Sequence, residues 1–225
     1  MVPEKRLVIF DCDGVLVDSE PISIEVLVAS FARAGVLIDE AGAYRRFLGR
    51  SLSTVIAAAR EEFGLDMDEA FLERLRQDLF ARFRAALRPI PGVIDALEAL
   101  QAHGIGWCVA SSSHMERIRL SLTVTGLIDR FDPNIFSAAM VARGKPAPDL
   151  FLHTAERMGR TPGDCIVIED SPAGIEAAKA AGMTVFAFTG GSHTHFASYR
   201  AALEALAPDA TFDAMADLIH LVAKE

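Results

Sequence analysis

The sequence predicts an α/β fold in which an all-helical module is inserted into a domain with a parallel sheet. Three observations support this prediction. Short apolar runs, which are typical of buried strands, alternate with helix-like stretches. The helix-like stretches that follow the later runs end at glycines, where helices commonly stop. About 90 residues separate the first apolar run from the second, far more than one crossover helix needs.

Four of the apolar runs are the predicted strands: Leu7–Phe10, Ile105–Ala110, Ile166–Ile168 and Thr184–Phe188. Four stretches of the same domain have helical character, and each is followed by its own stop glycine. These are 94–103 with Gly104, 115–125 with Gly126, 148–158 with Gly159, and 172–181 with Gly182. The alternation of strands and helices predicts that the strands run parallel.

Residues 21–88 form the predicted all-helical module. Its expected helices are one that begins near Pro21 and stops at Gly35, one over 53–63, and one that begins with a capping pair of Asp66 and Glu69. A proline- and glycine-containing segment at 88–92 then breaks the helical pattern. We therefore expect the joints between the module and the sheet domain near 17–20 and 88–92.

The composition is that of a globular protein, since 51% of the 225 residues are hydrophobic and 24% are charged. A net charge of −9 with no basic stripe argues against nucleic-acid and anionic-membrane partners. The sequence contains neither a signal-peptide pattern nor an apolar span long enough to cross a membrane. Cys12, Cys108 and Cys165 form no CxxC pair, so we interpret them as reduced packing residues of a cytoplasmic protein.

Two carboxylates follow the first predicted strand at once, which is unusual for a buried strand. Asp11 and Asp13 would point to the same side if the chain stayed extended. Two like charges at such a short distance repel each other unless a cation lies between them. The pair therefore favours a divalent metal, most simply Mg²⁺. The alternative is an acidic turn in which Gly14 supplies a positive φ angle.

Three later segments also place polar side chains at predicted strand ends or in a rigid turn. Hydroxyls begin at Ser111, Lys145 lies in a glycine–proline turn, and Glu169 with Asp170 follows another strand. Each has an ordinary alternative interpretation. Ser111 could cap the next helix, Lys145 could be a solvated surface charge, and the acidic pair could cap the helix that begins near Pro172.

Together with the acidic segment at 10–14, these segments resemble the four motifs of the haloacid dehalogenase-like (HAD) superfamily. Their order agrees, and the resemblance spans the whole chain. It implies a Rossmann-like α/β core domain formed by 1–16 and 89–225, with an inserted all-α cap domain over 17–88. By pattern, the chain is most similar to the sugar-phosphate phosphatases and β-phosphoglucomutases of that superfamily.

The resemblance implies phosphoryl transfer with Mg²⁺ as the cofactor. The implied catalytic residues are the nucleophile Asp11, the general acid and base Asp13, the phosphoryl-binding Ser111, and Lys145, which neutralises the phosphoryl group and the nucleophile. The implied metal ligands are Asp11, Asp13 and Asp170, with Glu169 binding directly or through water.

Residues of the cap and of the loop after the second strand are expected to contact the substrate. The predicted contacts are Glu20, Arg50, Ser112, Ser113 and His114. For Arg50, a solvated position at a helix end is an equally good interpretation. His193 and His195 could form a transition-metal pair, although a flexible polar loop explains both residues more simply.

The predicted function is a Mg²⁺-dependent phosphatase that hydrolyses a small phosphorylated sugar, sugar acid or polyol through an aspartyl-phosphate. One alternative is a phosphosugar mutase of the β-phosphoglucomutase type. Another is a catalytically idle binding or regulatory protein, which the intact set of motif residues disfavours. The identity of the ester and the oligomeric state are left open by the sequence.

Overall fold

The computed structural model describes residues 6–49 and 52–223, and over these residues the fold is built on one parallel sheet. The sheet has six strands in the order β3-β2-β1-β4-β5-β6. Their bounds are β1 Leu7–Phe10, β2 Gly106–Ser111, β3 Ile135–Ser137, β4 Cys165–Glu169, β5 Thr184–Phe188 and β6 Ala210–Phe212. The predicted α/β class with a parallel sheet is confirmed.

The four predicted strands coincide with β1, β2, β4 and β5 to within one residue at each end. The stop glycines Gly104, Gly126, Gly159 and Gly182 all have positive φ angles, as the predicted helix ends require. The two outer strands, β3 and β6, were not predicted. Each has three residues, which is too short for an apolar run to stand out from its surroundings.

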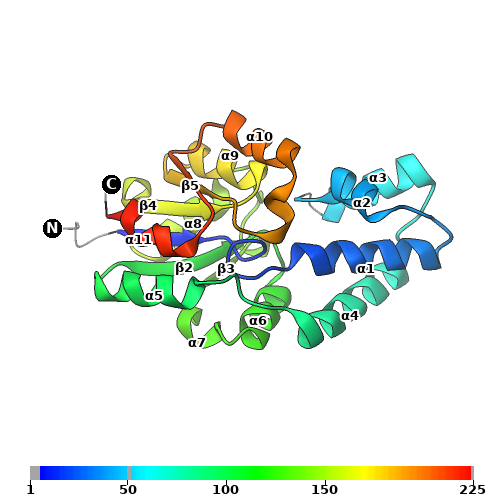
Figure 1. Cartoon of the computed structure of the whole chain (residues 1–225), viewed down its shortest axis with the longest axis horizontal. Coiled ribbons are helices and arrows are strands. Elements are labelled where there is room, and N and C mark those ends of the chain that lie inside the picture. Colours follow the sequence, from blue (N-terminus) through cyan, green and yellow to red (C-terminus); the bar gives the residue numbers. More distant parts are fainter. Residues whose placement is uncertain (1–5, 50–51, 224–225) are drawn as a thin grey trace. The chain divides into compact units, whose positions relative to one another are not determined.

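Helices cover both faces of the sheet (Figure 1). They are α5 Val93–Ala102, α6 Met115–Val124, α7 Ile128–Phe131, α8 Asp149–Arg157, α9 Pro172–Ala180, α10 Ala197–Ala205 and α11 Leu218–Val222. On one face, Leu7 and Ile9 of β1 share a buried core with Phe151 of α8 and Ile175 of α9. On the other, Phe10 meets the ring of Phe131 edge-on. Every residue of β1 is therefore buried, as a central parallel strand requires.

Residues 19–87 form a second compact unit, which is helical as predicted. Its helices are α1 Glu20–Arg33, α2 Glu40–Phe47, α3 Leu52–Phe63 and α4 Glu69–Ala86. The proposed capping pair of Asp66 and Glu69 is wrong. The side chain of Asp68 caps α4 by accepting a hydrogen bond from the backbone of Phe71, because Asp68 is the residue that directly precedes the helix.

The other compact unit contains residues 1–18 and 88–225, so the division differs by one or two residues from the expected domains. Val17 forms bridges with Asp13 and with Pro89, and the backbone N–H of Asp18 donates to the carbonyl of Arg88 at 3.0 Å. These backbone contacts attach residues 17, 18 and 88 to the sheet unit. That the helical unit acts as a cap stays a prediction.

All three cysteines are buried with free thiols, which agrees with their interpretation as packing residues. Within 6–49 and 52–223, no helix combines the length and the apolar character needed to cross a membrane.

Candidate active site

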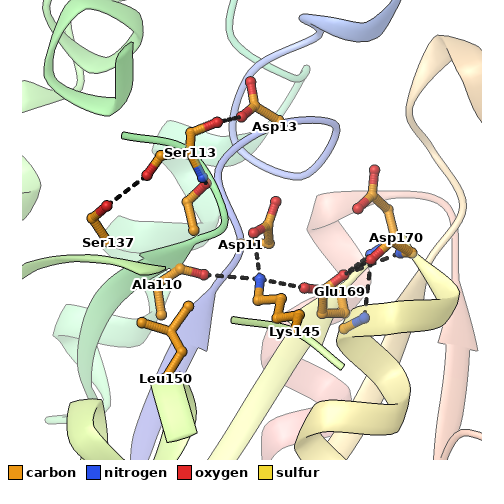
Figure 2. A network of polar contacts seen from close by, with 12 residues as sticks. Asp11, Asp13, Ala110, Ser113, Ser137, Lys145, Leu150, Glu169 and Asp170 are labelled. Carbon is orange, nitrogen blue, oxygen red and sulfur yellow. Dashed lines mark hydrogen bonds and ion pairs between the residues drawn. The ribbon is translucent and has the colours of Figure 1, made fainter. Parts of the chain in front are cut away.

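The candidate site lies where the carboxyl ends of three neighbouring strands meet. Asp11 directly follows β1, Ser111 ends β2, and Glu169 ends β4. In the sheet, β1 pairs with β2 on one side and with β4 on the other, so the chain switches direction across the sheet at β1. Parallel α/β sheets commonly bind ligands at such a switch point. Figure 2 shows the side chains that converge there.

Lys145 is the centre of this cluster, and only 3% of its side chain is exposed. Its Nζ donates to Oδ1 of Asp11 at 2.6 Å, to Oε1 of Glu169 at 2.5 Å, and to the carbonyl oxygen of Ala110 at 3.0 Å (Figure 2). The ammonium also lies 4.9 Å from the centre of the Phe151 ring. The alternative interpretation of Lys145 as a solvated surface charge is therefore wrong.

Burial sets the electrostatics of this group of charges. Burial raises the pKa of Asp11 well above its ordinary value; Lys145 opposes this shift, and the carboxylates of Glu169, Asp170 and Asp13 add to it. Burial by itself would lower the pKa of Lys145, but the charges of Asp11 and Glu169 and their hydrogen bonds outweigh it and raise the pKa. Lys145 is thus a permanent buried cation, facing a carboxylate whose ionisation is disfavoured.

Glu169 is held by contacts on both of its carboxylate oxygens. While Lys145 binds Oε1, Oε2 accepts hydrogen bonds from the backbone N–H groups of Asp170 and Ser171 at 3.1 Å and from the Ser171 hydroxyl at 2.9 Å. A Cβ on Gly174 would lie 1.8 Å from the Glu169 carboxyl, so a glycine is needed for α9 to approach it. The cap of α9 is Ser171, which corrects the interpretation of the acidic pair as the helix cap.

Asp13 has different partners from Asp11. Its Oδ2 accepts a hydrogen bond from the Ser113 hydroxyl at 2.7 Å, and its Oδ1 lies 2.8 Å from Nη2 of Arg117. The carbonyl of Ser113 in turn accepts a 2.7 Å hydrogen bond from the Ser137 hydroxyl (Figure 2). Arg117 was not predicted as a site residue. It lies 104 residues from Asp13, and nothing in its local pattern distinguishes it from a surface arginine.

The residues of the loop that follows β2 differ in how far they are buried. Ser111 is 1% exposed, and its Oγ accepts the backbone N–H of Ser113 at 3.1 Å. The residue that precedes α6 is His114, so the alternative role of Ser111 as the cap of that helix is wrong. Ser112 and His114 are exposed on the same loop.

His193 contacts the last of the acidic residues, Asp170. Its Nε2 lies 2.9 Å from Oδ2 of Asp170, and its side chain is 1% exposed. Burial raises the pKa of Asp170, and the hydrogen bond and charge of His193 act in the opposite direction. The interpretation of both histidines as a flexible polar loop is wrong for His193, which is buried, whereas His195 is exposed.

The donor set of the site fits a magnesium ion. Asp11 and Asp170 are buried carboxylates, and each would ionise more readily beside a divalent cation. Within the described residues, no three His, Cys, Asp or Glu side chains form a metal cluster. Mg²⁺ does not require one, because it usually binds through one or two carboxylates and completes its shell with water and phosphate oxygens. Ligation by Asp11, Asp13, Glu169 and Asp170 stays a prediction.

The remaining predicted substrate contacts belong to the helical unit. Glu20 is half-buried at the first position of α1. Arg50 lies outside the described residues. Both assignments stay predictions.

Comparison with known proteins adds to this geometry. The family model described as haloacid dehalogenase-like hydrolase matches residues 5–182. The chain is 33% identical to the 6-phosphogluconate phosphatase of Escherichia coli over 187 residues, which is 83% of each chain. It superimposes on the crystal structure of a haloacid dehalogenase-like protein of Agrobacterium tumefaciens with a TM-score of 0.84 and 36% identity, covering 97% of both chains.

A second structural neighbour carries a different activity in its name. The crystal structure of a putative β-phosphoglucomutase from Thermotoga maritima has a TM-score of 0.78 and 27% identity, and the match covers 97% of this chain and 99% of that one. The resemblance to phosphatases and β-phosphoglucomutases, expected from the sequence motifs, is thereby confirmed.

Proposed function

The chain belongs to the haloacid dehalogenase-like hydrolase family, and we propose that it is a Mg²⁺-dependent phosphatase acting on a small phosphorylated sugar, sugar acid or polyol. One observation carries the proposal: a buried lysine bridges the carboxylates of Asp11 and Glu169 at the switch point of the sheet. A permanent cation beside a buried carboxylate suits a site that must bring a carboxylate nucleophile to an anionic phosphate.

Asp11 is the proposed nucleophile. Lys145 engages its Oδ1, and a carboxylate oxygen of Asp11 attacks phosphorus. A P–O bond to the aspartate forms, and the P–O bond to the substrate alcohol breaks. Lys145 neutralises charge on both the carboxylate and the phosphoryl group, and Ser111 donates a hydrogen bond to a phosphoryl oxygen.

Asp13 is the proposed general acid and base. It protonates the leaving alkoxide in the first step, and in the second it takes a proton from the water that attacks phosphorus. The P–O bond to Asp11 then breaks, which releases inorganic phosphate and regenerates the free carboxylate. Ser113 and Arg117 hold the two oxygens of Asp13, so they orient this group between its two proton transfers.

Asp11 and Asp170 are the residues that would hold the metal, with Glu169 and Asp13 as the further predicted ligands. When bound, Mg²⁺ withdraws negative charge from the phosphoryl oxygens and lowers the repulsion that the carboxylate nucleophile meets. The buried free cysteines support placing this reaction in the cytoplasm, where thiols stay reduced.

The test is phosphate release from p-nitrophenyl phosphate and from a panel of three- to six-carbon phosphate esters, with Mg²⁺ and with EDTA. We expect Mg²⁺-dependent release that excess Ca²⁺ inhibits, because Ca²⁺ prefers more ligands at longer distances. The matched control is Asp11→Asn. Full activity in EDTA-treated protein would overturn the metal requirement, and absence of turnover on every ester would leave the idle relative as the better interpretation.

A mutase is the second candidate, and the likeness to a putative β-phosphoglucomutase favours it. Product analysis with a hexose phosphate separates the two functions. A phosphatase releases inorganic phosphate in step with substrate loss, whereas a mutase accumulates an isomeric sugar phosphate.

A further inference from the structure

His193 is a buried polar residue that the proposed mechanism does not use. It lies in the short η3 helix, Ser192–His195, after β5, and its side chain is 1% exposed. Its Nε2 lies 2.9 Å from Oδ2 of Asp170, the residue that directly follows β4. A buried imidazole in contact with a buried carboxylate of the site calls for a role beyond packing.

The residues around His193 leave space for its imidazole ring. A Cβ on Gly14 would lie 2.7 Å from its Cε1 and 1.8 Å from Oδ2 of Asp170, and a Cβ on Gly191 would lie 2.8 Å from the same ring carbon. Tyr199 meets the ring edge-on with the centroids 5.5 Å apart. Two glycines thus leave the room that the histidine and the aspartate occupy together.

The backbone on both sides of His193 is also anchored. The N–H and the hydroxyl of Ser192 both donate to the carboxylate of Asp18. On the other side, the hydroxyl of Thr194 donates to the carbonyls of Thr189 at 2.5 Å and Gly191 at 2.8 Å. A histidine held by its neighbours in this way has little freedom to turn away from Asp170.

We propose that His193 is a positioning residue that fixes the carboxylate of Asp170 in the orientation needed to bind Mg²⁺. This inference rests on the proposed function, because it assigns a role to the metal site of that function. His193 engages Oδ2, so Oδ1 is the oxygen that would be left to bind the metal. Carboxylate ligands are commonly held by hydrogen bonds from outside the coordination sphere, and loss of such a partner typically weakens metal affinity about 10- to 100-fold.

The test is calorimetric titration of the substrate-free protein with MgCl₂, comparing wild type with His193→Phe and His193→Gln. Phenylalanine keeps the ring and its contact with Tyr199 but has no nitrogen. Glutamine places an amide N–H near the position of Nε2. We expect His193→Phe to lose about 10- to 100-fold in Mg²⁺ affinity and His193→Gln to stay near wild type. His195→Ala is the matched control, an exposed histidine on the same loop, and should bind Mg²⁺ like wild type.

The outcomes separate this inference from the proposed function. If wild type binds Mg²⁺ and hydrolyses esters while His193→Phe binds Mg²⁺ equally well, the inference is overturned and the function stands. Equal losses in His193→Phe and His193→Gln would assign His193 to packing and overturn it as well. If wild type binds no Mg²⁺, the proposed metal site and this inference fail together.

A measurement on the wild-type protein covers the case in which His193→Phe does not fold. With ¹⁵N-labelled histidine, the ring nitrogen signals are followed through a MgCl₂ titration. We expect the His193 signals to shift in step with metal binding, whereas those of His195 stay in place. Saturation with Mg²⁺ without any shift at His193 would overturn the inference.

Discussion

The sheet unit contains buried ion pairs beside exposed ones, whereas the helical unit is represented here by an exposed pair. In the sheet unit, Lys145 pairs with Asp11 and Glu169, and the exposed fractions of these side chains are 3%, 10% and 1%. In the helical unit, Arg33 pairs with Asp78, and 59% and 42% of these side chains are exposed. Exposed pairs add little stability, whereas removing the cation of a buried cluster leaves its carboxylates uncompensated and strongly destabilises the protein.

The helical unit is instead held by aromatic packing. Phe31 of α1 is fully buried, and its ring meets those of Phe47, Phe63 and Phe71 at centroid distances of 5.5, 6.0 and 6.4 Å. Buried charges thus form the candidate site of the sheet unit, whereas apolar contacts form the packing of the helical unit. Substitutions in the two units test that division, and the largest effect should come from the sheet unit.

The largest effect is expected from Asp11→Asn, because an amide cannot form the acyl phosphate. Turnover of p-nitrophenyl phosphate should fall by about a thousandfold or more. A variant that kept more than a few percent of the wild-type rate would remove Asp11 from the nucleophile role. Circular dichroism should show unchanged helix content, because Lys145 keeps its contact with Glu169.

Lys145→Met should affect both chemistry and stability. Removing the cation leaves the carboxylates of Asp11 and Glu169 buried without it, which should lower the free energy of unfolding by about 3–5 kcal/mol. The rate should drop by about 100-fold or more, since a preorganised donor is lost. The matched control is Arg143→Met, two residues away and exposed, which should keep wild-type turnover. Equal effects of the two changes would contradict the contrast between buried and exposed pairs.

Phe31→Ala should break the helical unit without removing a charge. Loss of a fully buried ring should lower the free energy of unfolding by about 3–5 kcal/mol, measured by urea titration of the whole chain. Phe63→Ala, which removes a half-buried ring from the same cluster, should cost less. A larger loss at Phe63 than at Phe31 would show that the cluster is centred elsewhere.

Asp11→Asn should also change the pH dependence of stability in metal-free buffer. The pKa of Asp11 is raised in the folded protein above its ordinary value of 3.8, first by burial. The folded state therefore binds more protons than the unfolded state above that value, and the free energy of unfolding falls as the pH rises toward the folded pKa. Asn removes this loss, so the variant should be more stable than wild type at pH 7.

The gain in stability should disappear as the pH falls below about 3.8, where Asp11 is protonated in both states. Urea titrations at a series of pH values measure it. A variant less stable than wild type at pH 7 would mean that the ion pair with Lys145 outweighs the cost of burying the carboxylate.

The smallest effect is expected at the exposed pair of the helical unit. A double-mutant cycle with Arg33→Ala and Asp78→Ala should give a coupling free energy below about 1 kcal/mol. A coupling of several kcal/mol would contradict the view that the charges of this unit contribute little to its stability.

Much of the fold could be predicted because its signals are local. The residues of β1 form one continuous apolar run, and the helices of the sheet unit stop at glycines such as Gly104 and Gly182, which have positive φ angles. The strands β3 and β6 could not be predicted. Three residues at the edge of a sheet are defined by the neighbouring strand rather than by their own pattern.

For the site, the residues that end the central strands are predictable from the sequence. Asp11, Ser111 and Glu169 follow from the apolar runs that precede them, and their convergence follows from parallel pairing. The pairing of Arg117 with Asp13 and the burial of His193 against Asp170 depend instead on tertiary packing. Arginine is mostly exposed and histidine is intermediate in burial, and the contacts of both residues here come from segments of the chain more than 20 residues away. Such distant contacts cannot be recognised from a local sequence pattern.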